Sequence, residues 1–375
     1  MALGLYIHVP FCQSRCHFCS FYVRIHRADW ANAYLTSLQL EIQLHGAKRT
    51  LDRRAVDTVY FGGGTPTTLT STQLVQVLEW IRTAFELAPD PEISIEAHPD
   101  TITLEGLHRL AQAGFTRVSL GLQSADRHEL IRLGRLTEER PGQGLVALAR
   151  TAGFKSVNLD LMYGLPGQSY DRWMSNVDEV LACRPDHVSC YALTIEEHSH
   201  LHVDLKRGTL PPLDLAFQNE LEDAAAARLA EVGFERYEIS NYAQPGHSCR
   251  HNLLYWQGED YLGLGPSAQS YVNGVRFGNI SDLESYSANL AAGNLPLEDS
   301  VALTGEQRRR EALVFGLRLT RGVPYQLIEP ETLDVQWAAQ FAHLVREGLL
   351  VRETGRIRLT PEGRRMADSV AVALL

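Results

Sequence analysis

Over the first two-thirds of the chain, short apolar or β-branched runs alternate with amphipathic stretches. Three of the amphipathic stretches end alike, at Ala113-Gly114-Phe115, Ala152-Gly153-Phe154 and Val232-Gly233-Phe234. Glycine readily adopts the left-handed conformation that ends a helix, and the phenylalanine that follows can cover the last turn. Repeated strand–helix units give a parallel sheet with helices outside, so we expect an α/β barrel.

The hydrophobic pattern predicts where the elements of this barrel lie. The predicted strands are Leu5–Val9, Val56–Phe61, Glu92–Glu96, Arg117–Leu122, Ser156–Leu161 and His187–Tyr191. The predicted helices are Trp30–Leu44, Thr72–Phe85, Leu104–Ala113, Glu138–Ala152, Asp171–Ala182 and Phe217–Val232. A chain of 375 residues exceeds the usual single core, so we expect a further, smaller domain.

The pattern changes after about residue 240, where turn formers, aromatic residues and glycine replace the strand–helix units. From Glu306 on, it predicts a winged-helix-like α+β module. The expected elements are helices Glu306–Leu319 and Val335–Glu347, hairpin strands Leu349–Arg352 and Ile357–Thr360 with a turn at Thr354-Gly355, and a helix from Pro361. We therefore divide the chain into a barrel (residues 1–235), a connecting region (236–300) and a C-terminal domain (301–375).

The charge of the chain argues against a nucleic acid as its main partner, since the net charge is −10 and the isoelectric point about 5.8. The C-terminal module lacks a dense basic recognition helix, so we expect a lid or docking role for it. We see neither a signal peptide nor an apolar run near the roughly 20 residues that span a bilayer. Clustered thiols favour a reducing cytoplasm, and we expect a cytoplasmic protein that is at most peripheral to a membrane.

Three of the six cysteines, Cys12, Cys16 and Cys19, lie within eight residues. One short loop can therefore direct three thiolates to one metal centre, and thiolates favour iron–sulfur or zinc centres over hard cations. A structural zinc site normally takes four ligands, and no fourth cysteine follows nearby. A four-iron cluster on three thiolates would leave one iron open to a small molecule. The alternative is a loop that carries three reduced thiols.

Polar residues recur where the predicted strands end, which is where active sites gather in such barrels. The cysteine loop follows the first strand, Gly62-Gly63-Gly64-Thr65 follows the second, and Glu96 ends the third. Gln123 follows the fourth strand, and Asp160 closes the fifth. Taken singly, the glycines are typical of a turn and the carboxylates of a helix cap or ion pair. Their coincidence at one edge of the sheet predicts an active site.

Five segments carry a family resemblance. They are Leu5-Tyr-Ile-His-Val-Pro-Phe-Cys-x-x-x-Cys-x-Phe-Cys19, Tyr60-Phe-Gly-Gly-Gly-Thr-Pro66, Arg117-Val-Ser-Leu-Gly-Leu-Gln-Ser124, Leu133-Gly-Arg135 and Asn158-Leu-Asp-Leu-Met-Tyr-Gly-Leu-Pro-Gly167. They resemble the radical S-adenosylmethionine (SAM) family, and within it the oxygen-independent coproporphyrinogen dehydrogenases and the HemW-type haem chaperones. The resemblance covers nearly the whole chain. It implies a partial, open (β/α)6 barrel of the TIM type.

The resemblance also implies the cofactors. Cys12, Cys16 and Cys19 would hold a 4Fe–4S cluster, and the amino and carboxylate groups of SAM would chelate its open iron. An electron from the cluster would then cleave SAM to a 5′-deoxyadenosyl radical. By position, the implied SAM-site residues are Tyr6, Gly62, Gly63, Gly64, Thr65, Glu96, Gln123, Arg135 and Asp160. Without the resemblance, Tyr6 would be interpreted as a core aromatic residue.

Three features favour the chaperone branch. Phe21 stands where the dehydrogenases have a further cysteine, and the longer segment that precedes their cluster motif has no counterpart before Cys12. His251-Asn-Leu-Leu-Tyr-Trp256 resembles the His-Asn-x-x-Tyr-Trp haem-binding motif of the chaperones, in which imidazole can bind iron and the aromatic rings can face a porphyrin. Without the resemblance, His251 would be a hydrogen-bonded core or surface residue. Cys249 is either a second ligand or an incidental thiol.

The sequence therefore predicts a haem chaperone that binds a 4Fe–4S cluster, SAM and haem. It would deliver haem to haemoproteins, among them membrane-associated respiratory enzymes. The alternative is an oxygen-independent coproporphyrinogen III dehydrogenase of porphyrin biosynthesis, which converts propionates to vinyl groups by radical chemistry. A third hypothesis is a radical SAM scaffold that acts on another tetrapyrrole.

Overall fold

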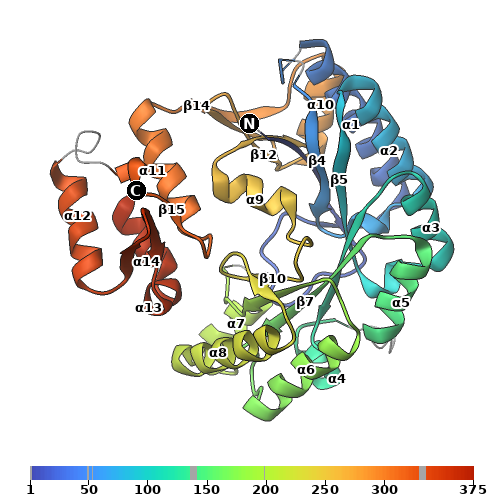
Figure 1. The fold of residues 1–375 in the computed structure, drawn as a ribbon. Helices are drawn as coiled ribbons and strands as arrows, with labels where there is room; N and C mark the ends of the chain where they lie inside the picture. Colours follow the sequence, from blue (N-terminus) through green and yellow to red (C-terminus); the bar gives the residue numbers. More distant parts are fainter. Residues whose placement is uncertain (1, 49, 53, 136–141, 198, 329–334) are drawn as a thin grey trace.

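The structure is a computed structural model that describes residues 2–48, 50–52, 54–135, 142–197, 199–328 and 335–375. A curved sheet with helices on its outer face forms an open barrel, and the C-terminal segment forms a separate lobe beside it (Figure 1). None of the described helices is long and apolar enough to cross a membrane.

All six predicted barrel strands are confirmed, and each neighbouring pair runs parallel in chain order. They are β1 Leu3–Val9, β4 Val56–Gly63, β5 Leu87–Ala97, β6 Arg117–Gln123, β7 Ser156–Tyr163 and β8 His187–Ala192. The matching helices are α1 Ala28–Lys48, α2 Ser71–Ala84, α3 Leu104–Gln112, α5 Gly142–Ala152, α6 Tyr170–Ala182 and α8 Leu215–Glu231. The predicted start of the fourth helix, at Glu138, lies outside the described residues.

The predicted helix ends are confirmed as well. Gly114, Gly153 and Gly233 have φ values of +104°, +104° and +87°, in the left-handed region that favours glycine. The phenylalanines that follow them are buried, with 2%, 5% and 6% of their surface exposed. Each glycine therefore ends its helix and turns the phenylalanine into the core.

Sequence periodicity missed several elements of the sheet. They are β10 Asn241–Ala243 and β9 Glu235–Arg236 beside β8, and β11 Asp260–Leu264, β12 Gln269–Val272, β13 Val275–Asn279 and β14 Leu297–Ala302 beyond β1. Within the described residues, β11 pairs parallel with β1 and so adds a seventh parallel strand, whereas the others pair antiparallel. The missed helices are α4 Arg127–Arg132, α7 His200–Lys206, α9 Arg250–Gln257 and α10 Leu283–Ala291.

The C-terminal lobe has the predicted winged-helix-like order. It comprises α11 Gly305–Gly316, β15 Val323–Pro324, α12 Val335–Arg346, β16 Leu350–Glu353, β17 Arg356–Leu359, α13 Pro361–Arg365 and α14 Ala367–Leu374. Its three strands form a small antiparallel sheet, and residues such as Trp337, Phe341 and Ile357 form a hydrophobic core separate from that of the barrel. The predicted fold class, an open α/β barrel with a C-terminal α+β domain, is thus confirmed.

Candidate functional site

A cavity of about 460 Å³ lies where the barrel strands end. Ten of the thirteen predicted site residues line it: Cys12, Cys16, Cys19, Gly63, Gly64, Thr65, Glu96, Gln123, Arg135 and Asp160. Because parallel strands bring their carboxyl ends to one edge, residues far apart in the sequence meet there. Three predicted residues, Tyr6, Gly62 and His251, do not line this cavity.

The cysteine loop leaves the barrel through a short parallel pair, in which β2 (Phe11–Cys12) bonds to β3 (Arg24–Ile25). Burial raises the pKa of the Cys12 thiol to about 11, against the opposing effect of a hydrogen bond to Thr65, and burial also raises the pKa of Cys16. Within the described residues, no three His, Cys, Asp or Glu side chains are placed to hold one metal ion. The three thiols fit a cluster better than a single zinc ion, since each thiolate of a cluster binds a different iron.

The glycine segment packs directly against the cysteine loop. The Gly64 amide donates to the Val9 carbonyl at 2.9 Å, and the Thr65 amide donates to the Phe11 carbonyl at 2.7 Å. A Cβ atom on Gly64 would lie 2.6 Å from the Phe11 carbonyl oxygen and 3.1 Å from the Cys12 sulfur. These two amides are therefore used by the protein itself. The Gly64 and Thr65 amides are not free for a ligand, because the close approach of the two loops needs these hydrogen bonds.

Two carboxyl groups face the cavity from strands on either side of β6, Glu96 from β5 and Asp160 from β7. Burial raises the pKa of Glu96 to about 7, although Tyr60 donates a hydrogen bond of 2.8 Å to its carboxylate. Burial also raises the pKa of Asp160, which accepts hydrogen bonds from Asn158 at 2.7 Å and from Ser119 at 3.3 Å. Both groups can accept hydrogen bonds from hydroxyl or ammonium groups of a ligand.

Gln123 and Arg135 bring unsatisfied polar atoms to the same cavity. Gln123 has a φ of +69°, which strains a residue other than glycine, and such strain is often stored at functional sites. Among the described residues, neither the buried Gln123 Oε1 nor the buried Arg135 Nε has a hydrogen-bond partner. Buried polar atoms normally have partners, so both indicate a polar ligand in the cavity.

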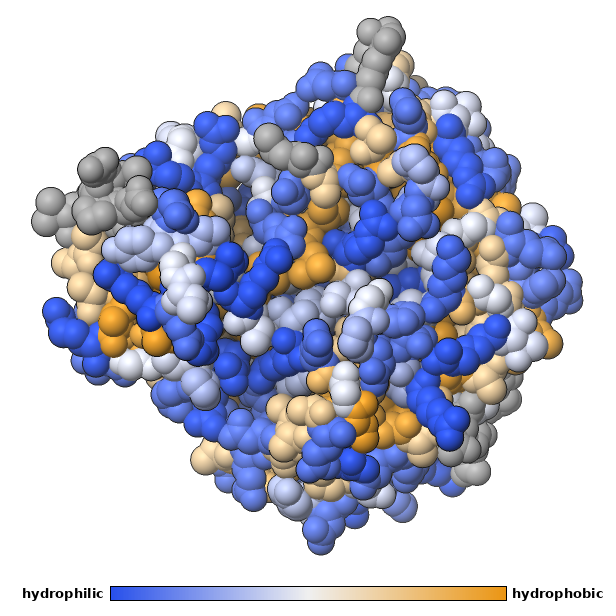
Figure 2. Space-filling view, viewed as in Figure 1, coloured by the Kyte–Doolittle hydropathy of each residue, from blue (hydrophilic) through white to orange (hydrophobic). Residues whose placement is uncertain are grey.

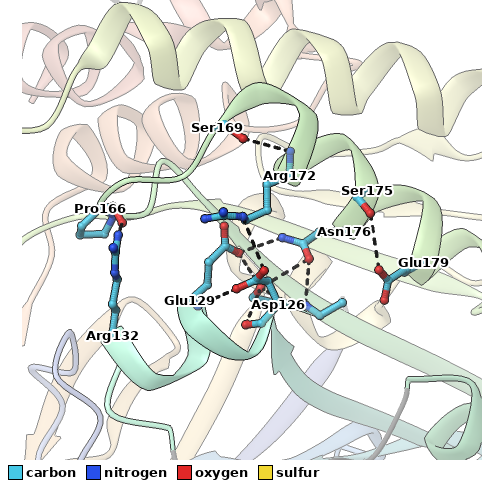
Figure 3. Close-up of polar contacts among 11 residues, drawn as sticks. Asp126, Glu129, Arg132, Pro166, Ser169, Arg172, Ser175, Asn176 and Glu179 are labelled. Atoms are coloured by element: carbon cyan, nitrogen blue, oxygen red, sulfur yellow. Dashed lines mark hydrogen bonds and ion pairs between the residues drawn. The ribbon is translucent and has the colours of Figure 1, made fainter.

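Figure 3 shows a polar network around Glu129 on α4, the helix that precedes Arg135. Glu129 on α4 accepts hydrogen bonds from Ser124 at 2.6 Å and from Asn176 on α6 at 2.9 Å, and it is almost fully buried. The Arg135 amide then closes the end of α4 with a bond of 2.9 Å to the Leu130 carbonyl. The short helix missed by the sequence analysis thus positions a predicted site residue.

Tyr6 and Gly62 lie behind the cavity. The Tyr6 ring stacks on Tyr60, with centroids 6.2 Å apart, and on His251, with centroids 6.5 Å apart. A Cβ atom on Gly62 would lie 3.1 Å from both the Tyr6 ring and Glu96 Oε2. Gly62 therefore leaves room for the Glu96 carboxyl group, and Tyr6 packs against Tyr60, which donates a hydrogen bond to Glu96.

His251 on α9 is buried, with 1% of its surface exposed. Its Nδ1 lies 2.7 Å from Thr58 Oγ1, and its Nε2 lies 2.9 Å from the Tyr255 hydroxyl. Burial and the charge of Arg117 lower its pKa to about 3, so the ring is neutral. Both ring nitrogens are engaged, and binding to iron would require one hydrogen bond to be exchanged.

The Cys249 thiol lies 3.5 Å from a carboxylate oxygen of Glu92. Cys249 is fully buried, and burial raises the pKa of its thiol to about 12.

Sequence reasoning also missed polar residues around Asp160. Ser119 lines the cavity, and Asn158 donates to Ser119 at 2.7 Å as well as to Ser189 on β8 at 3.0 Å. Asn158 and Asp160 stand two residues apart on β7, so both point to the same face of the sheet. This alternation along the strand could have identified Asn158 as a neighbour of Asp160 from the sequence.

Comparisons with known proteins agree with this architecture. Residues 6–180 match the model of the radical SAM superfamily, and residues 303–366 match that of the HemN C-terminal domain. Proteins called heme chaperone HemW from Mycobacterium tuberculosis and Bacillus subtilis are 38% and 31% identical to this chain; the alignments cover 99% of it and 94% and 98% of those proteins. The solved Escherichia coli coproporphyrinogen III oxidase (HemN), a radical SAM enzyme, has a TM-score of 0.83 and 26% identity, over 100% of this chain and 90% of its own.

Proposed function

This chain belongs to the radical SAM superfamily and, within it, to the HemW family, and from this premise we propose that it is a haem chaperone that carries a 4Fe–4S cluster and SAM. Full-length similarity to proteins with that name carries the proposal. Haem bound by the chain would be delivered to haemoproteins, among them respiratory enzymes at the membrane.

Cys12, Cys16 and Cys19 would hold the cluster at the mouth of the barrel cavity. Thr65 lies 3.5 Å from the Cys12 sulfur and can donate a hydrogen bond to its thiolate. When bound, a cluster of this type supplies the electron for reductive cleavage of SAM. The Gly64 and Thr65 amides bond to the Val9 and Phe11 carbonyls and so anchor the start of the cysteine loop.

SAM carries a carboxylate, an ammonium group, a sulfonium and ribose hydroxyls, and the cavity offers a counterpart for each kind of charge. Arg135 and Gln123 hold donors for a carboxylate or an ether oxygen. Glu96 and Asp160 hold acceptors for ammonium and hydroxyl groups. The unsatisfied Arg135 Nε is a donor for a carboxylate, and the unsatisfied Gln123 Oε1 is an acceptor for an ammonium or hydroxyl group, so these two atoms support the assignment most directly.

Haem would bind through the region of His251, Tyr255 and Trp256. Phe21 supports this function over the dehydrogenase, because it lines the mouth of the barrel cavity with 67% of its surface exposed and cannot act as a thiolate. The dehydrogenase remains the second candidate, because HemN matches the whole chain in structure.

Anaerobic reconstitution followed by two parallel assays tests the proposal. We expect the reconstituted protein to bind haem and to leave coproporphyrinogen III unchanged when SAM and a reductant are present. Robust conversion of coproporphyrinogen III to protoporphyrinogen IX would replace the chaperone by the enzyme. Absence of haem binding together with absence of conversion would favour a different tetrapyrrole.

A further inference from the structure

A second cavity, of about 570 Å³, lies between α9 and α11. Figure 1 shows α9 between the barrel and the C-terminal lobe, with α11 on the side of the lobe that faces it. Hydrophobic side chains reach the surface in the same region of the space-filling view (Figure 2). The volume is in the range of cavities that bind organic ligands of moderate size.

Aromatic side chains form much of the wall of this cavity. They are Tyr255 and Trp256 from α9, Tyr261 and Tyr271 from the sheet, and Phe315 from α11. The Tyr255 and Tyr261 rings contact edge to face, with centroids 4.6 Å apart, so each is fixed by its neighbour. Flat, rigid apolar walls suit a flat apolar ligand.

Three arginines, Arg276, Arg308 and Arg309, line the same cavity, against the carboxylates of Glu259 and Glu311. Arg276 is paired with Glu311 at 2.9 Å. For Arg308 and Arg309, by contrast, the part of the chain that the structure describes provides no ion pair. The cavity thus offers two unpaired cations beside its aromatic walls.

The position of these two arginines makes a bound anion more favourable. They occupy the beginning of α11, where the helix dipole disfavours positive charge. Arg308 also packs over the turn after β12, since a Cβ atom on Gly274 would lie 2.8 Å from its Nη1. A bound carboxylate would offset both the repulsion between neighbouring arginines and the unfavourable dipole.

His251 lines neither cavity but contacts residues that lead to both. On one side its ring stacks on Tyr60, with centroids 5.1 Å apart, and Tyr60 donates to Glu96 of the barrel cavity. On the other side it bonds to Tyr255, which lines the second cavity. The motif that includes His251 therefore reaches the second cavity through Tyr255 and Trp256.

We propose that the second cavity binds haem, with the macrocycle against the aromatic walls and the two propionates paired with Arg308 and Arg309. This inference rests on the proposed function and specifies the site that serves it. Haem matches both features of the cavity, because it is a flat apolar macrocycle with two carboxylates on one edge. SAM and haem would then occupy different cavities at the same time.

The charge of the site can be tested by titrating the full-length protein with haem and with haem dimethyl ester, which lacks the two carboxylate charges. We expect the double variant Arg308→Gln and Arg309→Gln to bind haem at least tenfold more weakly and to bind the ester unchanged. Arg346→Gln is the matched control, since Arg346 is an exposed arginine on α12 outside the cavity. SAM binding should stay unchanged in both variants.

The volume of the site can be tested with Gly305→Trp. Gly305 lines the cavity, and a Cβ atom there would meet nothing within 4 Å, so a side chain can be attached at this position without a clash at its Cβ. We expect weaker binding of both haem and its ester. Gly144→Trp is the control, because Gly144 on α5 is equally open and lies elsewhere.

The outcomes separate the site from the function. If the double arginine variant and Gly305→Trp bind haem as tightly as the wild type, the site assignment is wrong and the chaperone proposal stands. If the wild-type protein binds no haem at all, both are overturned. A loss of haem binding in the Arg346→Gln control to the same degree would also refute the specific pairing with Arg308 and Arg309.

Discussion

The barrel cavity is lined by residues that follow successive strands of one parallel sheet, whereas the cavity beside α11 is lined by two helices and an antiparallel edge of that sheet. The first gathers thiols, carboxylates and unsatisfied polar atoms, and the second gathers aromatic rings and arginines. Each set suits a different ligand, and His251 is buried between them. The contrast teaches that two sites of different chemistry can be linked through one buried residue.

The largest expected effect comes from removing the thiols of the barrel cavity. The triple variant Cys12→Ala, Cys16→Ala and Cys19→Ala should lose all cluster iron and sulfide after anaerobic reconstitution, because no other thiol lines that cavity among the described residues. Haem binding should remain, since the second cavity contains none of these residues. Iron and sulfide analysis beside a haem titration measures both. Stoichiometric zinc with no iron uptake by the wild type would contradict the cluster.

A side chain on Gly64 should damage both the cluster site and the SAM site of the barrel cavity. A Cβ atom on Gly64 would strike the Phe11 carbonyl and approach the Cys12 sulfur, so Gly64→Ala should lower both cluster content and SAM affinity. We expect destabilisation of about 1–3 kcal/mol. Thermal unfolding and iron analysis would reveal it; a fully loaded cluster would refute the contact.

Much of the barrel cavity could be predicted from the sequence, because its motifs, apart from that of Arg135 after α4, stand at the ends of apolar runs that form strands. Glu96 and Asp160 were located in this way, and both line the cavity. The second cavity could not be predicted. Its arginines on α11 meet Tyr255 only through packing between distant segments, and periodicity reports local structure alone.

The local environment of His251 could not be predicted from the sequence either. Its partner Thr58 lies 193 residues away, and no helix was predicted at α9, where turn formers give way to aromatic residues and glycine. The fold of the barrel thus followed from repeated local signals. The hydrogen bonds that engage both ring nitrogens of His251 depend instead on tertiary contacts, which periodicity does not report.

Substitution of His251 should affect the contacts that link the two cavities. His251→Ala leaves the Thr58 and Tyr255 hydroxyls without their present partner, at a cost of about 1–3 kcal/mol in stability. We expect weaker haem binding and a changed haem spectrum, measured by optical titration. Tyr255→Phe is the comparison, because it removes one hydrogen bond and keeps the imidazole. An identical spectrum in His251→Ala and the wild type would show that the imidazole does not bind the iron.

The smallest expected effect is a pH dependence confined to the barrel cavity. The pKa of Glu96 is raised to about 7 by burial, with a further contribution from Asp160 and opposing ones from Tyr60 and Arg117. If SAM binds the ionised carboxylate, its affinity should fall about tenfold per pH unit below pH 7 and level off above it.

The sign of the effect of Glu96 on folding is the opposite. A carboxyl whose folded pKa lies above its unfolded value of about 4.5 contributes stability that is present below pH 4.5 and is lost as the pH rises through 7. Glu96→Gln should flatten the dependence of SAM affinity on pH, whereas haem affinity in the second cavity should not respond to this substitution. Calorimetric titration with SAM from pH 6 to pH 8 provides the measurement. A midpoint near pH 7 that persists in Glu96→Gln would assign the titration to another group of the cavity, such as Asp160, whose pKa burial also raises.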